Sequence, residues 1–203
     1  MTLTPNVRTL AVGFATLLLS GCVNIGTKPK TPPNLLTLIP ATARAAAAEQ
    51  TPKLEQTVSM TLPIVPQMLS VNRIPVTGAT GRITYIGDAN WVEPPAALFR
   101  ALVGEVVSAK MGRVVVDPRT LPVVAGTRLS GQLAAFGIDE STSQAVVTYD
   151  ALLARKGVAS VAARRFSARV AVAPINGPNA GAALNDAANQ VAAQIADWIG
   201  RAE

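Results

Sequence analysis

The stretch RLSGQLAAFGIDESTSQAVVTYDALLARKGVASVAARRFSARVAV, residues 128–172, decides the fold of this 203-residue chain. Three apolar-rich segments within it, 128–138, 144–154 and 158–172, have the composition expected of strands. Turn-forming residues, Asp139-Glu140-Ser141 and Lys156-Gly157, lie between them. Because these connections are short enough for hairpins, the spacing predicts an antiparallel meander of three strands.

Shorter elements precede the meander. A helix is expected to begin near Pro94-Pro95, because proline is tolerated in a first turn and the preceding Glu93 suits the positive helix start. Gly112 ends this helix, and its apolar residues recur at helical spacing: Leu98, Leu102 and Val106. Strands are predicted at 35–39, 58–65, 72–76 and 82–86, with a short buried strand at 114–116. The alanine-rich segment 41–50 is either a helical turn or a loop.

The end of the chain supplies a second helix. Residues 174–181 are predicted to form a loop, and residues 182–199 a helix with a narrow apolar stripe of Leu184, Ala188, Val191, Ile195 and Trp198. Such a stripe is typical of core packing. Strands, helix, strands and helix in this order predict an α+β fold, in which an antiparallel or mixed sheet packs two main helices on one face.

The N-terminus has the pattern of a bacterial lipoprotein signal. A basic Arg8 precedes a short apolar run at residues 10–19, too short to span a bilayer, and small residues follow it. The end of the run, Leu19-Ser20-Gly21-Cys22, matches a lipobox, in which the cysteine thiol accepts the diacylglycerol. We therefore expect cleavage after residue 21 and lipidation of Cys22. An ordinary signal peptide with an incidental cysteine is the alternative.

The expected mature chain forms a tether and one domain. Residues 22–34 are proline-rich and polar after the lipidated cysteine, which indicates a semi-extended tether, and residues 35–203 are long enough for a single α+β domain. Without residues 1–21, 17 Lys and Arg remain against 12 Asp and Glu. These charges are scattered, without the aromatic platform that single-stranded nucleic acids need, so we expect no nucleic acid partner. Mild attraction to anionic lipid or plain surface solvation explains them.

Catalytic chemistry has little support in the sequence. Histidine is absent, and the only cysteine is the one expected to carry lipid. No Gly-x-Ser-x-Gly, Ser-x-x-Lys or Gly-x-x-x-x-Gly-Lys motif occurs. Asp88 and Glu93 flank Trp91 in a segment expected to be a loop, where a carboxylate pair for hydrolysis is conceivable, although a solvated loop explains them equally well. The sequence favours a protein that is not an enzyme and needs no cofactor or metal.

Short motifs in a fixed order carry a family resemblance. They are Thr61-Leu62-Pro63, Asn72-Arg73-Ile74-Pro75-Val76, Ile83-Thr84-Tyr85, Asn90-Trp91-Val92-Glu93-Pro94, Tyr149-Asp150-Ala151, Arg164-Arg165-Phe166 and Ala183-Leu184-Asn185. Together with the lipobox, this order resembles the ABC-type transport auxiliary lipoproteins over residues 34–200. At Leu35-Leu36-Thr37-Leu38 the chain lacks the aromatic residue that relatives often carry before the Thr-Leu pair.

The resemblance implies a docking protein of the cell envelope. Its partner would be the periplasmic substrate-binding protein, of the mammalian-cell-entry type, of an ABC transporter that moves phospholipid or other hydrophobic molecules. The lipid anchor would hold the protein at the periplasmic face of the outer membrane, since Val23 and not aspartate follows Cys22. Addition of a strand at an exposed sheet edge is a docking mode that suits such a domain.

Several points stay open at the level of the sequence. Trp91 and Glu93 are the candidate docking residues, although a tryptophan before a helix is more often a core residue. An assembly lipoprotein that partners an outer-membrane barrel and a stand-alone lipid carrier are the alternative functions. The sequence does not decide whether the chain forms a homo-oligomer.

Overall fold

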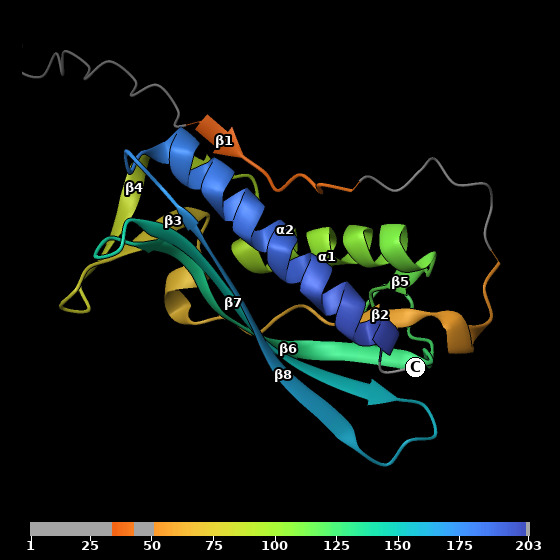
Figure 1. Cartoon of the computed structure of the whole chain (residues 1–203). Helices are drawn as coiled ribbons and strands as arrows, with labels where there is room; N and C mark the ends of the chain where they lie inside the picture. The colour runs from red at the N-terminus through yellow and green to blue at the C-terminus, as the bar shows by residue number, and fades with distance from the viewer. Residues whose placement is uncertain (1–33, 43–50, 202–203) are drawn as a thin grey trace, which may run out of the picture. The chain divides into compact units, whose positions relative to one another are not determined.

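The computed structural model describes residues 34–42 and 51–201 of the chain. They form a mixed sheet of eight strands and two α-helices, which confirms the predicted α+β class. Figure 1 shows both helices over the same side of the sheet. The expected signal peptide, Cys22, most of the tether and most of the segment 41–50 lie outside the described residues.

The predicted antiparallel meander of three strands is present in the sheet. Strands β6 (Thr127–Asp139), β7 (Gln144–Arg155) and β8 (Val161–Ala171) pair antiparallel in chain order. Alternate residues of β7 are buried, because successive side chains of a strand point to opposite faces. Tyr149 of β7 is thus buried and lies in register with Leu133 of β6 and Phe166 of β8.

The remaining strands attach to the other side of β6. Strand β2 (Val58–Met60) runs parallel to one end of β6 and β3 (Arg73–Thr77) to its other end. Strand β4 (Ile83–Trp91) pairs antiparallel with β3, and the short strands β1 (Asn34–Leu36) and β5 (Val115–Val116) pair with β4 and β2. Two single-turn 3-10 helices, η1 (Leu54–Gln56) and η2 (Gln67–Leu69), connect these pieces.

Three of these strands differ in length from the prediction. Strand β1 ends at Leu36 and not at residue 39. Strand β2 ends at Met60 and not near residue 65, and only an isolated bridge from Ile64 to Gln132 continues it, because Pro63 cannot donate to a ladder. Strand β4 runs five residues past the predicted end at residue 86, to Trp91. The predicted strand at 114–116 is present as β5, but its residues are half-buried.

Helix α1 (Pro95–Met111) begins and ends where the sequence predicts. Proline occupies its first turn, and Gly112 follows it at φ 65°, the left-handed conformation in which glycine ends helices. Phe99 of α1 packs on Tyr149 with ring centroids 5.3 Å apart. Because Tyr149 belongs to β7, the middle strand of the meander, this contact fixes α1 against β7.

Helix α2 (Gly177–Arg201) begins earlier than predicted, so the expected loop at 174–181 is wrong for its second half. The side chain of Asn176 accepts a hydrogen bond from the backbone N–H of Asn179 at 3.0 Å and so caps the helix. Gly177 and Gly181, which indicated a loop, are instead sites of close approach. A Cβ atom at Gly177 would lie 2.5 Å from Cβ of Ala89, and one at Gly181 would lie 2.6 Å from Cδ1 of Leu36.

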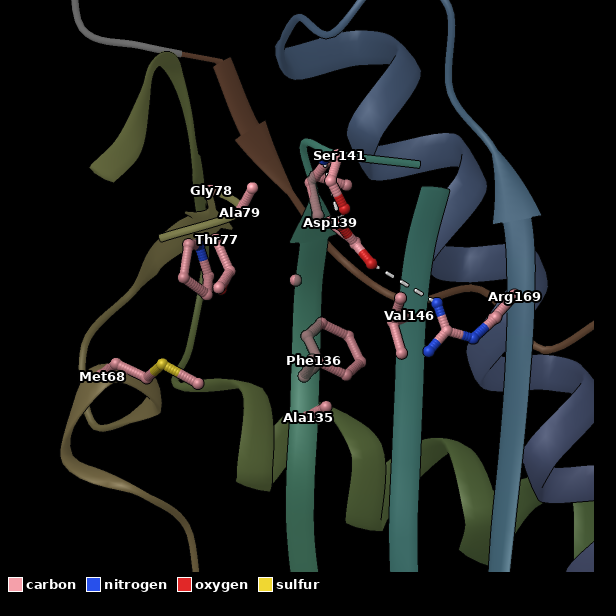
Figure 2. A pocket seen from close by; sticks show the side chains of 13 residues that line it. Met68, Thr77, Gly78, Ala79, Ala135, Phe136, Asp139, Ser141, Val146 and Arg169 are labelled. Carbon is pink, nitrogen blue, oxygen red and sulfur yellow. Dashed lines mark hydrogen bonds and ion pairs between the residues drawn. The ribbon is translucent and has the colours of Figure 1, made fainter. Parts of the chain in front are cut away.

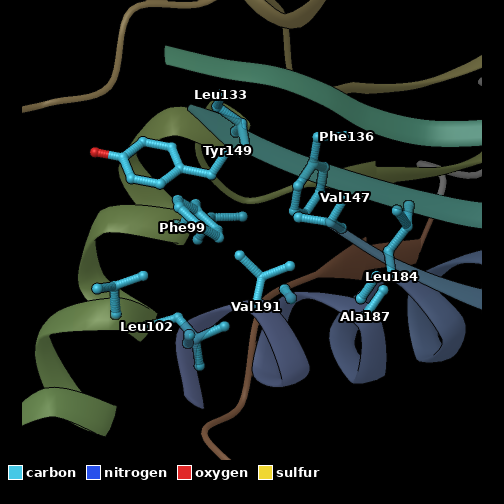
Figure 3. Packing of buried hydrophobic residues seen from close by; sticks show 14 of the residues in the cluster. Phe99, Leu102, Leu133, Phe136, Val147, Tyr149, Leu184, Ala187 and Val191 are labelled. Carbon is cyan, nitrogen blue, oxygen red and sulfur yellow. The ribbon is translucent and has the colours of Figure 1, made fainter. Parts of the chain in front are cut away.

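The core lies between the two helices and the sheet face that they cover (Figure 3). The predicted stripe on α2 is confirmed as core: Leu184, Ala188, Val191 and Ile195 are fully buried, and Trp198 packs at the edge of the ring of Phe166 at 5.4 Å. Within residues 34–42 and 51–201, the search for a helix long and apolar enough to cross a membrane finds none.

Candidate docking surface

Trp91 lies in the core and not in a loop. It is the last residue of β4, its side chain is 1% exposed, and its ring meets Phe136 edge-on at 5.5 Å. The backbone N–H of Trp91 donates to the carbonyl of Asn72 at 2.8 Å, which extends the pairing of β4 with the region of β3. The expected loop is therefore wrong, and Trp91 offers no exposed surface to a partner. Glu93 is exposed in the turn before α1.

Asp88 has a structural contact that the sequence did not suggest. It lies within β4, and its two carboxylate oxygens accept a hydrogen bond from the backbone N–H of Gly177 at 3.0 and 3.2 Å. A carboxylate at a helix N-terminus is stabilised by the helix dipole. Asp88 therefore fixes the start of α2 to the sheet and does not form the carboxylate pair considered with Glu93. The described residues also contain no group of three side chains suited to a metal ion.

The segment after β1 is fixed along α2 by two asparagines that sequence reasoning missed. The backbone N–H groups of Ile39 and Ala41 donate to Oδ1 of Asn185 and of Asn189, each at 2.7 Å. The side-chain amide of Asn189 also donates to the carbonyl of Ile39 at 2.9 Å. This side chain therefore both accepts and donates a backbone hydrogen bond, as the backbone of a paired strand does. Their spacing of four residues, which places both on one helix face, was the available signal. These contacts hold residues 39–41 along α2.

The face of the sheet away from the helices carries a first hollow (Figure 2). It has a volume of about 330 Å³, and Ala135 and Val146 lie on its floor. Asp139 and Arg169 stand at its rim, joined by an ion pair of 3.6 Å. The hydroxyl of Ser141 donates to Asp139 at 2.6 Å, and this hydrogen bond lowers the pKa of the carboxyl group.

A second hollow of about 450 Å³ crosses the other end of the same three strands. Its most exposed apolar side chains are Ile64, 72% exposed, and Leu152, 45% exposed. Arg165 of β8 forms a bidentate pair with Asp150 of β7, with Nε to Oδ1 at 2.6 Å and Nη2 to Oδ2 at 2.8 Å. These hydrogen bonds lower the pKa of Asp150.

The carboxylates around both hollows are engaged by neighbouring groups. A hydrogen bond or an ion pair lowers the pKa of Asp139 and of Asp150. The hydroxyl groups of Thr148 and Ser167 lie 2.9 Å apart and bond each other between the two hollows. This face can bind polar and apolar groups side by side.

Strand β8 is a free edge in the described part of the chain. It pairs with β7 on one side, and no described strand pairs with its other side. Its eleven residues therefore present a row of unpaired backbone groups, which is a template for the addition of another strand. An α+β domain with an open sheet face and a free edge strand defines a class of architecture suited to binding.

Comparison with known proteins identifies the family. The sequence model of one protein family, the ABC-type transport auxiliary lipoprotein component, matches residues 36–196. The chain belongs to this family. No curated protein matches the sequence. A crystal structure of a Xanthomonas campestris protein of family DUF330 superposes with a TM-score of 0.65 at 18% identity and covers 81% of this chain and 94% of that one. Another crystal structure, of an uncharacterized protein, gives a TM-score of 0.62 at 18% identity and covers 74% and 96%.

Proposed function

We propose that this protein is the lipid-anchored auxiliary component of an ABC transporter of the mammalian-cell-entry type. In this proposal the transporter moves phospholipid or another hydrophobic molecule across the cell envelope. The lipoprotein docks the transporter's periplasmic substrate-binding protein and turns over no substrate itself. Cys22 carries the lipid, residues 1–21 are its signal peptide, and the anchor lies in the outer membrane, with the domain on the periplasmic side.

Membership of the auxiliary lipoprotein family is the observation that carries the proposal. The free edge of β8 and the open sheet face support a docking role, because both offer contacts that a partner can complete. The engaged carboxylates of Asp139 and Asp150 support a role without catalysis. Glu93 remains exposed and is kept as a candidate contact, whereas Trp91 is not.

A genetic test follows from this proposal. Deletion of the gene should weaken the outer-membrane barrier to detergents or hydrophobic toxins. If the lipoprotein and the mammalian-cell-entry protein act in one pathway, deleting both genes should give the defect of either single deletion. A clearly additive defect would contradict the proposal and favour assembly of an outer-membrane barrel. The arrangement of neighbouring genes gives an independent check, since ATPase, permease and mammalian-cell-entry genes should lie beside this one.

A further inference from the structure

The β7–β8 hairpin ends in an arm that extends beyond the helices, and we call residues 152–165 the distal arm (Figure 1). Every residue from Lys156 to Arg165 is exposed. Exposed apolar side chains stand on it as well, with Val158 at 52% and Val161 at 59% exposure. The first half of β8 thus lies in solvent on both faces as well as along its edge.

The distal arm lies in the most basic part of the chain. Residues 151–185 contain no Asp or Glu, but they contain five basic side chains: Arg155, Lys156, Arg164, Arg165 and Arg169. Three of these contact carboxylates from outside the stretch: Lys156 with Glu55, Arg165 with Asp150, and Arg169 with Asp139. The surface therefore keeps an excess of positive charge.

Arg164 differs from Arg165 and Arg169 in having no ion pair among the described residues. Its guanidinium lies over the ring of Phe166, 5.1 Å from the centroid, which holds the charge in place. Basic side chains on an edge strand often serve to repel other strands. Here, however, Arg165 pairs with Asp150 of the neighbouring strand β7, and Arg169 pairs with Asp139 of β6. They therefore repel another strand less than unpaired lysines would.

The distal arm also lies far from the point where the tether enters. The guanidinium of Arg155, the last residue of β7, donates to the carbonyl of Ile199 near the end of α2 at 3.1 Å. Asn34 pairs with Ala89, beside the start of α2. Helix α2 has 25 residues, and at a rise of about 1.5 Å per residue it separates these two points by roughly 35 Å.

From this placement we propose that β8 is the docking edge for the transporter's periplasmic protein, and that it pairs with an extended, acidic segment of that protein. The partner segment adds to the free edge by backbone hydrogen bonds, which is the chemistry of strand addition. Its acidic side chains face Arg164, and its apolar side chains contact Val158 and Val161. Anchorage at one end of α2 and docking at the other let the domain reach from the membrane toward its partner. The inference rests on the proposed function and adds the surface and the chemistry of the partner.

Hydrogen exchange on the full-length lipoprotein in detergent tests the edge directly. The probe is the purified mammalian-cell-entry protein of the same organism, whose gene the proposed function expects beside this one. Its addition should slow the exchange of amides in residues 161–171, because alternate N–H groups of β8 gain partners. Slowed exchange confined to other strands would overturn the inference, although it would leave the proposed function intact. If this protein does not bind at all, the proposed function itself fails.

Charge reversal tests the chemistry of the partner. Arg164→Glu should weaken binding of the same protein at least about tenfold, as expected for the reversal of an interfacial charge. Arg164→Lys, which keeps the charge, should restore most of the affinity. Arg73→Glu is the matched control, because Arg73 also stacks on an aromatic ring, Tyr85, at 4.4 Å but lies on β3. It should leave the affinity within about twofold of the parent protein.

A membrane is the other anionic surface that could attract the distal arm. Vesicles of phosphatidylglycerol in phosphatidylcholine are the probe for it. If Arg164→Glu abolishes binding to these vesicles while binding of the periplasmic protein is unchanged, the arm is a membrane contact and the inference is wrong. Thermal melts of each variant show whether it is folded. Equal loss of affinity in Arg164→Glu and in the Arg73→Glu control would also contradict the inference.

Discussion

Replacement of Trp91 by alanine should destabilise the domain strongly. The side chain is 1% exposed and meets Phe136 at 5.5 Å, so its removal leaves a large cavity in the core. Its indole Nε1 has no hydrogen-bond partner among the described residues, so packing accounts for the loss. Truncation of a buried tryptophan costs about 3–5 kcal/mol. For a domain of this size, that lowers the Tm by roughly 6–20 °C.

Thermal melts followed by circular dichroism measure this change. Trp91→Phe should lose clearly less stability, because phenylalanine keeps an aromatic contact with Phe136. Trp198→Ala is a second comparison, since Trp198 is only partly buried against Phe166 and should cost less than Trp91. The core assignment would be refuted if Trp91→Ala had the same Tm as the parent protein but bound the partner more weakly by about 2 kcal/mol or more. That result would restore the docking interpretation.

Three further predictions concern Asp88, Asp117 and Cys22. Asp88→Ala should cost about 1 kcal/mol in urea unfolding, because the N–H of Gly177 loses its acceptor, and an unchanged midpoint would remove Asp88 as a cap of α2. A hydrogen bond from Arg119 lowers the pKa of Asp117 from 3.8 to about 2, so this carboxylate contributes stability at higher pH that is lost as the pH falls through about 2. Between pH of about 3.8 and about 2, the free energy of unfolding of Asp117→Asn should therefore fall less steeply than that of the parent protein. An identical fall in both proteins would contradict the lowered pKa of Asp117. Cys22→Ser should abolish incorporation of radiolabelled fatty acid and leave uncleaved precursor, and label retained by the variant would exclude Cys22 as the lipidation site.

The predictable parts of the fold were those that periodicity determines locally. The meander of β6, β7 and β8 and the helix α1 follow from alternation, turn residues and helical spacing within short windows. The buried stripe from Leu184 to Ile195 was found in the same way. These elements carry most of the core, so the α+β class followed from them.

The parts that differed depend on contacts between distant residues. Gly177 and Gly181 look like loop residues in the sequence, but they lie within α2, where Ala89 and Leu36 leave no room for a Cβ atom. Trp91 was placed in a loop because the pairing of β4 with distant strands cannot be seen locally. The contacts of Asn185 and Asn189 with residues 39–41 span nearly 150 positions in the sequence. The only local signal for them is that the two asparagines lie on the same face of the helix.

The central claim is that this lipoprotein docks a transporter component of the mammalian-cell-entry type. Chemical crosslinking in intact cells, followed by purification of the full-length lipoprotein and mass spectrometry, tests it most directly. The account predicts a crosslinked species that contains the mammalian-cell-entry protein of the neighbouring genes and that disappears when this protein is deleted. Crosslinks that join the lipoprotein to an outer-membrane barrel alone, and persist in that deletion, would contradict the account.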